Sequence, residues 1–224
     1  MKKVTKIVLA VSAITLLFAL EASAQVGIGA DVVSRYVWRG TDFGNSAAVQ
    51  PALSYAKGNL EVGAWGSFAI DDGSANENDL YVSYAAGPLT VMLTDYFFPG
   101  YTGADDFFEY GDDAGVHILE LGGSYATGPL SLSAFYNLSG DNSADDSGSM
   151  YVEVGYTPSY SADGIELSLF AGAGNGFYTV EDAGDEDAFG VVNLGITASK
   201  DAMSVSYIVN PDQETSFLVF GYSF

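Results

Sequence analysis

Hydrophobic and polar residues alternate along most of the chain, and the last ten residues show this most regularly. Large apolar side chains take every second position there, at Leu218, Phe220, Tyr222 and Phe224. The positions between them become smaller toward the end of the chain, from Phe217 to Ser223. A period of two places each set on one face of an extended chain, which predicts a β-strand.

The same alternation, interrupted by turn residues, predicts twelve strands in all. They are Val26–Arg39, Ala47–Tyr55, Asn59–Ile70, Asp79–Ala85, Leu89–Phe98, His117–Tyr125, Leu130–Leu138, Met150–Tyr156, Ile165–Ala171, Phe189–Ala198, Met203–Val209 and Ser216–Phe224. Beyond the N-terminal segment, no stretch keeps the 3.6-residue period and the capping residues of a helix, so we expect an all-β fold.

The connections between these strands alternate between a short kind and a long, acidic kind. The short ones lie at residues 56–58, 86–88, 126–129, 158–164 and 199–202, and the long ones at residues 40–46, 71–78, 99–116, 139–149, 172–188 and 210–215. Of the 28 acidic residues beyond position 24, 20 belong to the long connections if Asp79 is counted with them. An even strand number with acids sorted to one end predicts an antiparallel transmembrane β-barrel, with short periplasmic turns and long outer loops.

The two faces of the predicted strands differ strongly. One face is apolar and includes Val26, Ile28, Tyr36, Trp38, Leu80, Val82, Leu130, Leu132 and Val192; the other is small, polar or charged. We expect the apolar face to contact lipid and the polar face to line the interior. A water-soluble barrel with its apolar face inward also fits the alternation, but it gives no reason for acids at one end.

Asp95 interrupts the apolar face of its strand. A carboxylate in contact with lipid is costly. We therefore expect a bulge at Asp95, or a strand turned the other way, with Met92, Tyr96 and Phe98 outward.

Three short connections share the pattern Tyr-Ala-x-Gly-(Pro/Asn)-Leu, at residues 55–60, 84–89 and 125–130. The Gly and Pro or Asn residues reverse the chain, but turn formation does not require the preceding tyrosine. In a barrel these tyrosines, together with Tyr156, would lie at one membrane–water interface, where the ring stays apolar and the hydroxyl stays wet.

The N-terminal residues have the features of an export signal. Lys2, Lys3 and Lys6 precede a mostly apolar stretch, Ile7–Leu20, that is shorter than the roughly 18 residues of a membrane helix. Ala22-Ser-Ala24 then supplies a cleavage site. We expect a secretory signal peptide at residues 1–24 and an outer-membrane barrel at residues 25–224.

Charge and composition exclude several classes of function. Beyond residue 24 the chain has four basic side chains against 28 acidic ones, and it has no cysteine. Nucleic acid is not an expected partner, because like charges repel and no basic patch exists. Without cysteine there is neither a disulfide nor a cysteine-linked lipid anchor.

Little in the sequence suggests catalysis. His117 is the single histidine, and its same-face neighbour is Leu119 rather than serine, so the nucleophile–base pair of a lipid-hydrolysing barrel is missing. We expect no enzyme, no cofactor and no assigned metal. The loop acids Asp105-Asp106, Asp112-Asp113, Asp145-Asp146 and Asp185-Glu-Asp187 offer oxygen ligands for calcium, but none has the spacing of an EF-hand loop. Calcium binding by these loops is left open.

The charged residues expected inside the barrel form the candidate pore-lining site. They are Asp31, Arg35, Arg39, Glu61, Glu120, Glu153 and Glu166, with the two arginines on one face of the first predicted strand. They could form a network that fills the barrel, or a charged constriction that ions pass. Barrels of about eight strands are filled by side chains and those of 16–18 strands leave a channel, so a strand number of twelve does not decide whether the lumen is open. The many small Gly and Ser residues on the inner face favour an open lumen.

Two parts of the chain resemble known proteins. The closing strand, with its terminal Phe224, resembles the last strand of bacterial outer-membrane barrels, which implies that the barrel-assembly machinery binds it. The segments Asp31–Gly40, Val49–Tyr55 and Gly63–Ser67 resemble the TorF-type porin family in its Tyr-x-x-Arg-Gly, x-Gln-x-x-Leu-x-Tyr and Gly-x-Trp-Gly-Ser elements. The match is good over the N-terminal third and loose beyond it. It implies an outer-membrane barrel of the porin kind, and it does not identify a substrate.

These features predict a narrow, passive pore in the outer membrane of a Gram-negative bacterium. Its partners would be outer-membrane lipid and small hydrophilic solutes or ions, with cations preferred because acids outnumber bases. The alternative is a closed barrel with a structural or surface-binding role through its acidic loops. If the pore hypothesis holds, neutralising Arg35 and Arg39 should raise conductance or cation preference.

Overall fold

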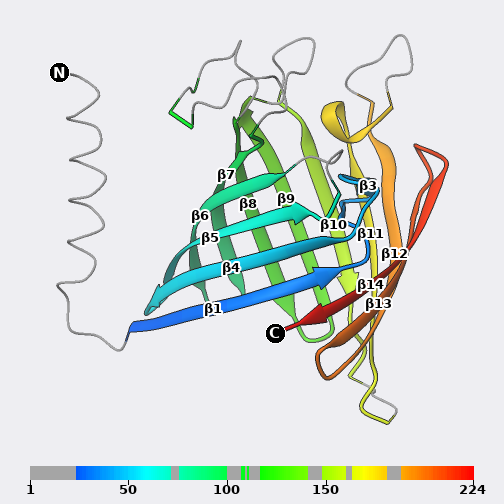
Figure 1. Ribbon diagram of the computed structural model, residues 1–224, viewed down its shortest axis with the longest axis horizontal. Coiled ribbons are helices and arrows are strands. Elements are labelled where there is room, and N and C mark those ends of the chain that lie inside the picture. Colours follow the sequence, from blue (N-terminus) through cyan, green and yellow to red (C-terminus); the bar gives the residue numbers. More distant parts are fainter. Residues whose placement is uncertain are drawn as a thin grey trace.

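The computed structural model describes residues 24–71, 76–99, 107–108, 110, 117–140, 148–159, 163–180 and 188–224. Within them, twelve strands form a closed antiparallel barrel (Figure 1). The predicted fold class and strand number are therefore confirmed. The expected signal peptide up to residue 23 and the loop acids considered for calcium lie outside the described residues.

Each barrel strand pairs with its neighbours in sequence, and the first strand closes the barrel against the last. The strands are β1 (Ala24–Val33), β4 (Ala48–Lys57), β5 (Leu60–Ala69), β6 (Glu77–Ala86), β7 (Leu89–Phe97), β8 (His117–Thr127), β9 (Leu130–Ser139), β10 (Met150–Tyr156), β11 (Glu166–Gly174), β12 (Gly190–Lys200), β13 (Met203–Asn210) and β14 (Thr215–Ser223). Two short strands, β2 (Val37–Trp38) and β3 (Thr41–Asp42), form a separate hairpin, and η1 (Gly176–Tyr178) is a 3₁₀ turn. No helix in the described part of the chain is long and apolar enough to cross a membrane.

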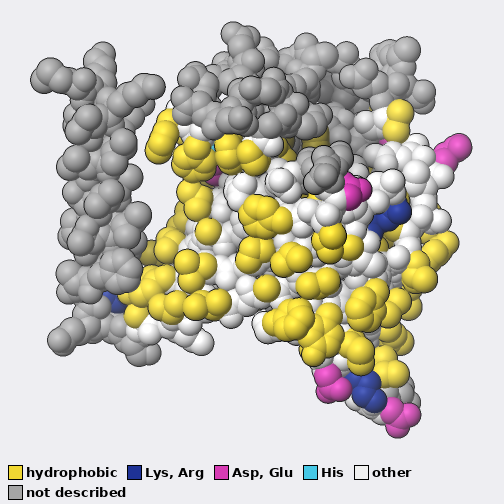
Figure 2. Space-filling model, viewed as in Figure 1, with side chains coloured by type: hydrophobic (Ala, Val, Ile, Leu, Met, Phe, Trp, Pro, Cys, Tyr) yellow, Lys and Arg dark blue, Asp and Glu magenta, His cyan; other side chains and the backbone are white. Residues whose placement is uncertain are grey.

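The outward face of the barrel is apolar (Figure 2). Exposed side chains at alternate strand positions include Val26, Ile28, Leu53, Leu80, Leu132, Leu167 and Leu194, and Ile28 is 83% exposed. Tyr84, Tyr125 and Tyr156 are also exposed, at strand ends beside short turns, as the repeated turn motif predicts. Buried side chains are largely polar and point inward, among them Gln50, Ser67, Asn137 and Asn193. The expected facing is confirmed for these strands, and it reverses that of a soluble protein. The expectation that Tyr36 and Trp38 face lipid is wrong, because both pack against side chains inside the barrel.

Two register shifts change which side chains reach the interior. In β12, Asn193 lies opposite Gly172 and Val191 opposite Ala173, so Val192 has no opposite residue and forms a β-bulge. Val192 is fully buried, so the expectation that it faces lipid is wrong. A second shift lies between Leu119 and Glu120, where β8 pairs with β9.

Asp95 faces outward on a regular strand. It pairs with Leu80 on one side and Leu119 on the other, without a register shift in either ladder of β7. The Tyr96 hydroxyl reaches an inward-facing glutamate, so that side chain points inside. Both sequence-based expectations for this strand, a bulge or a reversed facing, are therefore wrong.

The Asp95 carboxylate is instead paired on the outer surface. Its Oδ1 lies 2.8 Å from Nδ1 of His117, and the Tyr110 hydroxyl donates to Oδ2 at 2.7 Å. Nε2 of His117 lies 2.9 Å from the carbonyl oxygen of Phe107. Both ring nitrogens therefore lie within hydrogen-bonding distance of oxygen atoms, and the Asp95 carboxylate has two polar partners on this face.

Candidate functional site: a hairpin folded into the lumen

The first strand ends at Val33 rather than at Arg39 as predicted. The Ser34 N–H still donates to the Phe220 carbonyl, at 2.8 Å, and the chain then leaves the barrel wall. Strands β2 and β3 pair around a two-residue turn, Arg39-Gly40. Both turn residues have positive φ, 49° and 83°, as in a type I′ hairpin. Arg39 is thus held in a backbone region that side-chain-bearing residues seldom adopt.

The tip of this hairpin, residues 37–42, packs against the wall at β13 and β12, two and three strands from β1 around the barrel. The Gly40 carbonyl accepts a hydrogen bond from Asn210 Nδ2 at 3.1 Å, and Asn210 is fully buried. A Cβ atom on Gly40 would lie 1.9 Å from the Val192 carbonyl oxygen. Thr41 Oγ1 accepts a further bond from Gln213 Nε2 at 3.3 Å. Only glycine fits at position 40.

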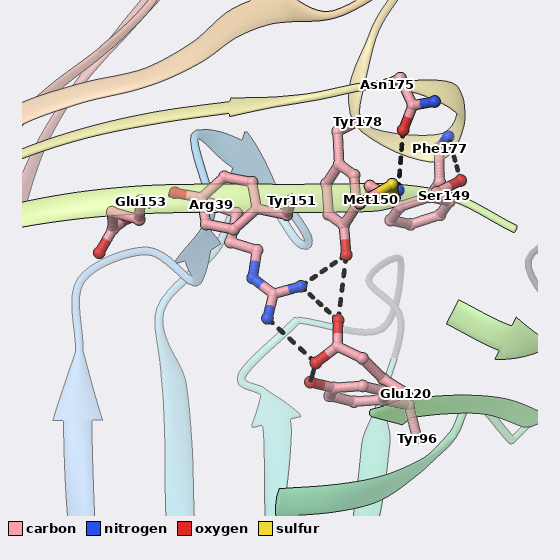
Figure 3. Close-up of polar contacts among 10 residues, drawn as sticks. All are labelled: Arg39, Tyr96, Glu120, Ser149, Met150, Tyr151, Glu153, Asn175, Phe177 and Tyr178. Atoms are coloured by element: carbon pink, nitrogen blue, oxygen red, sulfur yellow. Dashed lines mark hydrogen bonds and ion pairs between the residues drawn. The ribbon is translucent and has the colours of Figure 1, made fainter. Parts of the chain in front are cut away.

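Arg39 is the centre of the site (Figure 3). Its guanidinium forms a two-point ion pair with Glu120 of β8, through Nη2 to Oε1 at 3.0 Å and through a shorter contact from Nη1 to Oε2. Nη1 also donates to the Tyr178 hydroxyl at 2.5 Å. The Tyr96 hydroxyl donates to Oε1 at 2.9 Å, and the Tyr178 hydroxyl donates to Oε2 at 3.2 Å. The side chains of Arg39 and Glu120 are only 8% and 1% exposed.

Aromatic rings surround the same guanidinium. Its Cζ atom lies 3.9 Å from the ring centroid of Phe135, 4.2 Å from Trp38, 4.7 Å from Tyr151 and 5.5 Å from Tyr178. Such cation–π contacts are strongest where water is excluded. The cation is therefore held by charge on one side and by ring faces on the others.

Further ring contacts tie the hairpin segment to other parts of the barrel. Tyr36 packs on Trp65 of β5 at 5.6 Å, and Phe43 stacks on Phe98 and Phe177 at 6.5 and 6.3 Å. Trp38 meets Tyr96 and Tyr178 edge-on or tilted, at 5.5 and 5.9 Å. The segment thus touches the wall in several directions, so it lies across the lumen.

Electrostatics keep this cluster in one protonation state. Burial is the largest single effect and lowers the pKa of Arg39. The hydrogen bond to Glu120 and the charge interactions with Tyr178, Glu120 and Tyr96 together outweigh it and raise that pKa above its ordinary value. Burial also raises the pKa of the Tyr178 hydroxyl; the Arg39 charge opposes this, and the Glu120 charge adds to it. Arg39 stays a cation, and Tyr178 stays a neutral donor.

The two predicted pore arginines do not share a face of the first strand, because that strand ends before both of them. Arg35 pairs with Asp42 inside the hairpin segment at 2.6 Å, and its side chain is 34% exposed. Arg39 lies at the hairpin tip. Of the predicted site residues, the structure brings together only Arg39 and Glu120 as an ion pair.

The remaining predicted site residues are spread around the interior. Glu61 accepts a hydrogen bond from the Tyr81 hydroxyl at 2.8 Å. Glu153 accepts one from Tyr151 and another from Asn193 Nδ2 at 3.0 Å. Asp31 and Glu166 occupy inward strand positions next to the outward-facing Val32 and Leu167.

The tyrosines that contact Arg39, and Asn210, which holds the hairpin through Gly40, were not identified from the sequence. Tyr96, Tyr151 and Tyr178 lie far along the chain from Arg39, and no spacing links them to it. One local signal was available: Gly40 follows Arg39 at the end of the predicted strand, and a glycine there is consistent with a turn.

The fold and the site define a class: a closed twelve-stranded barrel with an apolar exterior, a polar interior and a hairpin folded across its lumen. The chain belongs to a family described as "Bacterial protein of unknown function (Gcw_chp)", whose sequence model matches residues 19–220. This match does not confirm the TorF-type resemblance. No curated protein matches the chain.

Among solved structures, a mutant of the Rh. blastica porin is similar to the chain. The identity is 12% and the TM-score is 0.35, and the alignment covers 90% of this chain and 100% of that one. The two chains differ too much for a residue of one to be assigned to a residue of the other.

Proposed function

We propose that this protein is a narrow, passive channel of the bacterial outer membrane for small hydrophilic solutes or ions, with passage set by the hairpin. The observation that carries the proposal is an apolar exterior around a polar interior that one noncovalently held hairpin crosses. An apolar outward band and a polar interior are what a transmembrane barrel requires. The exposed Phe224, directly after β14, remains our proposed contact for the barrel-assembly machinery.

Small and acidic side chains away from the hairpin support a pathway that prefers cations. Ser54, Ser133 and Ser168 point inward and are partly exposed. Glu61 and Glu153 point into the same space, and the only cation in the centre of the hairpin site, Arg39, is neutralised by Glu120. A lumen with excess negative charge attracts cations.

A closed barrel with a structural or surface-binding role is the second candidate. The near-complete burial of Glu120 and Asn210 favours it, because the lumen is filled at that level. The two candidates differ in whether the hairpin can let solutes past.

Ion conductance across a planar bilayer, measured with a salt gradient, tests the proposal. We expect small, cation-selective steps from the wild type, and larger steps when residues 37–42 are replaced by a flexible Gly-Ser linker. The matched control is the conservative Arg35→Lys change, which keeps the pair with Asp42 and should leave the steps unchanged. If both the wild type and the linker variant fold and remain silent, the channel proposal is wrong and the closed barrel is the better description.

A further inference from the structure

Two carboxyl groups in the lumen wall have no basic partner. Glu77 and Asp79 occupy alternate, inward positions at the outer end of β6 and are 4% and 6% exposed. Every basic side chain beyond residue 24 is among the described residues: Arg35 and Arg39 pair with other acids, and the two lysines lie beside short turns at the opposite end of the barrel. Burying two unbalanced negative charges is costly, so the pair must be neutralised, either by protons or by a cation from outside the chain.

The contacts of the pair leave an oxygen atom unused. The Tyr36 hydroxyl donates to the Glu77 carboxylate, and the Glu77 and Asp79 carboxyl groups lie within hydrogen-bonding reach of each other. The Phe97 N–H donates to Asp79. Asp79 Oδ1 has no hydrogen-bond partner, so these contacts use its other oxygen. Burial and the Glu77 charge raise the pKa of Tyr36, which keeps the phenol a neutral donor.

A second unused oxygen lies on the next strand. Thr94 is 5% exposed, and its Oγ1 has no hydrogen-bond partner. Asp79 pairs with Tyr96 and Tyr81 pairs with Thr94, so Thr94 is the diagonal neighbour of Asp79 on the same inward face. Buried polar atoms are nearly always paired. Asp79 Oδ1 and Thr94 Oγ1 are thus two buried oxygen atoms on diagonal positions of one inward face, and neither uses its lone pairs within the protein, so both are free to bind a cation.

We infer that Glu77, Asp79 and Thr94 bind a hard divalent cation, with calcium the best fit. All donors are oxygen atoms, which calcium prefers, and water completes its flexible shell. The proposed site has two carboxylates and one hydroxyl; no larger group of three or more His, Cys, Asp or Glu side chains in the described residues is placed to hold a metal. With only two carboxylates the site should bind calcium with a Kd of roughly 0.1–1 mM, the range of weak extracellular sites.

The site would connect the wall to the hairpin segment. Glu77 holds the hydroxyl of Tyr36, which directly precedes β2, and the Tyr36 ring packs on Trp65. Trp65 lies directly opposite Asp79 in the β5–β6 ladder. A cation between the carboxylates would order the start of the hairpin. Its binding would change the fluorescence of Trp65, one of the two tryptophans of the chain.

Terbium luminescence tests the inference on the refolded full chain. Tb³⁺ replaces Ca²⁺ in oxygen sites and emits when a nearby tryptophan is excited. We expect sensitised emission that calcium competes away at roughly millimolar concentration and that falls at least about tenfold in Glu77→Gln/Asp79→Asn. Glu166→Gln, an inward but exposed carboxylate on another strand, is the matched control and should keep the emission. Trp65→Phe should lose the emission but keep bound calcium, measured by equilibrium dialysis.

The outcomes distinguish a cation at this carboxyl pair from a cation bound elsewhere and from a proton shared by the pair. Emission that survives Glu77→Gln/Asp79→Asn places the ion elsewhere, for instance at the acidic loops, and overturns the inference. Absence of calcium binding at neutral pH also overturns it and indicates that the two carboxyl groups share a proton. Heat-dependent gel mobility and circular dichroism establish that each variant folds, and Asp79→Asn alone is the milder second variant. Conductance is recorded separately, so failure of the channel proposal does not affect this result.

Discussion

Replacing Arg39 by Met tests whether the ion pair at the hairpin tip holds the hairpin in the lumen. Methionine keeps most of the apolar stem and removes the charge, which leaves the 1%-exposed Glu120 carboxylate without a cation. Breaking a buried ion pair by removing one partner typically costs about 3–5 kcal/mol. Loss of the ring contacts around the guanidinium adds to this, at about 0.5–2 kcal/mol for a desolvated cation–π site.

The measurement is urea unfolding of the protein in lipid vesicles, followed by tryptophan fluorescence. We expect Arg39→Met to lower the free energy of unfolding by about 3.5–7 kcal/mol, the sum of the two contributions. Arg35→Met is the matched control, because the Arg35–Asp42 pair lies in the same segment but is partly exposed. Exposed pairs contribute up to about 1 kcal/mol.

A double variant separates the ion pair from general packing. Arg39→Met/Glu120→Gln removes the unpaired charge, and Tyr96 and Tyr178 can still hydrogen-bond the amide that replaces the carboxylate. We expect the double variant to recover most of the lost free energy. The reasoning is refuted if Arg39→Met is no worse than Arg35→Met, or if the double variant is as unstable as the single one.

Three further predictions concern other parts of the molecule. Gly40→Ala should displace the hairpin, because the added Cβ has no room and the φ angle is positive; a red shift of Trp38 emission would record this, and unchanged emission would contradict it. His117→Leu should lower stability by about 1–3 kcal/mol, since Asp95 loses its partner on the outer face, and adding Asp95→Asn should reverse most of the loss in the same urea assay. Tyr178→Phe should flatten the alkaline loss of stability: folding raises the Tyr178 pKa, so its contribution is complete below the ordinary value of about 10 and is lost as pH rises through the folded value. Unfolding midpoints from roughly pH 9 to 12 should therefore fall less in this variant than in the wild type.

The barrel could be predicted from the sequence because its signals are local and repeated. Each strand carries its own alternation, and each connection has its own length, so Leu130–Tyr136 or Leu218–Phe224 can be assigned without knowing any partner. The tyrosines beside short turns are equally local. These features fix strand number and facing before any pairing is considered.

The site could not be predicted, because its contacts join distant parts of the chain. Tyr36 and Trp38 continue the apolar alternation of the first strand, and Arg35 and Arg39 continue its polar face, so the pattern ran on past the true end at Val33. The bulge at Val192 shifts facing by one position without any turn residue to mark it.

Asp95 shows the opposite case, in which a broken rule was informative. The carboxylate on an apolar face did mark a special position. The reason for it lies in the register that places His117 opposite Phe97, next to Asp95 on the outer surface. A single sequence does not give that register across a long connection.

The position of the hairpin also has a consequence for the order of events during biogenesis. The segment follows the first strand, yet Gly40 bonds to Asn210, 170 residues later, and Arg39 bonds to Tyr178, 139 residues later. Contacts between such distant residues form late and slowly. The hairpin can therefore take its final place only after β12 and β13 have joined the wall. A barrel closed in a shifted register would leave the Gly40 carbonyl without the Asn210 amide, so the final position of the hairpin depends on the correct pairing of β12 and β13 with the rest of the wall.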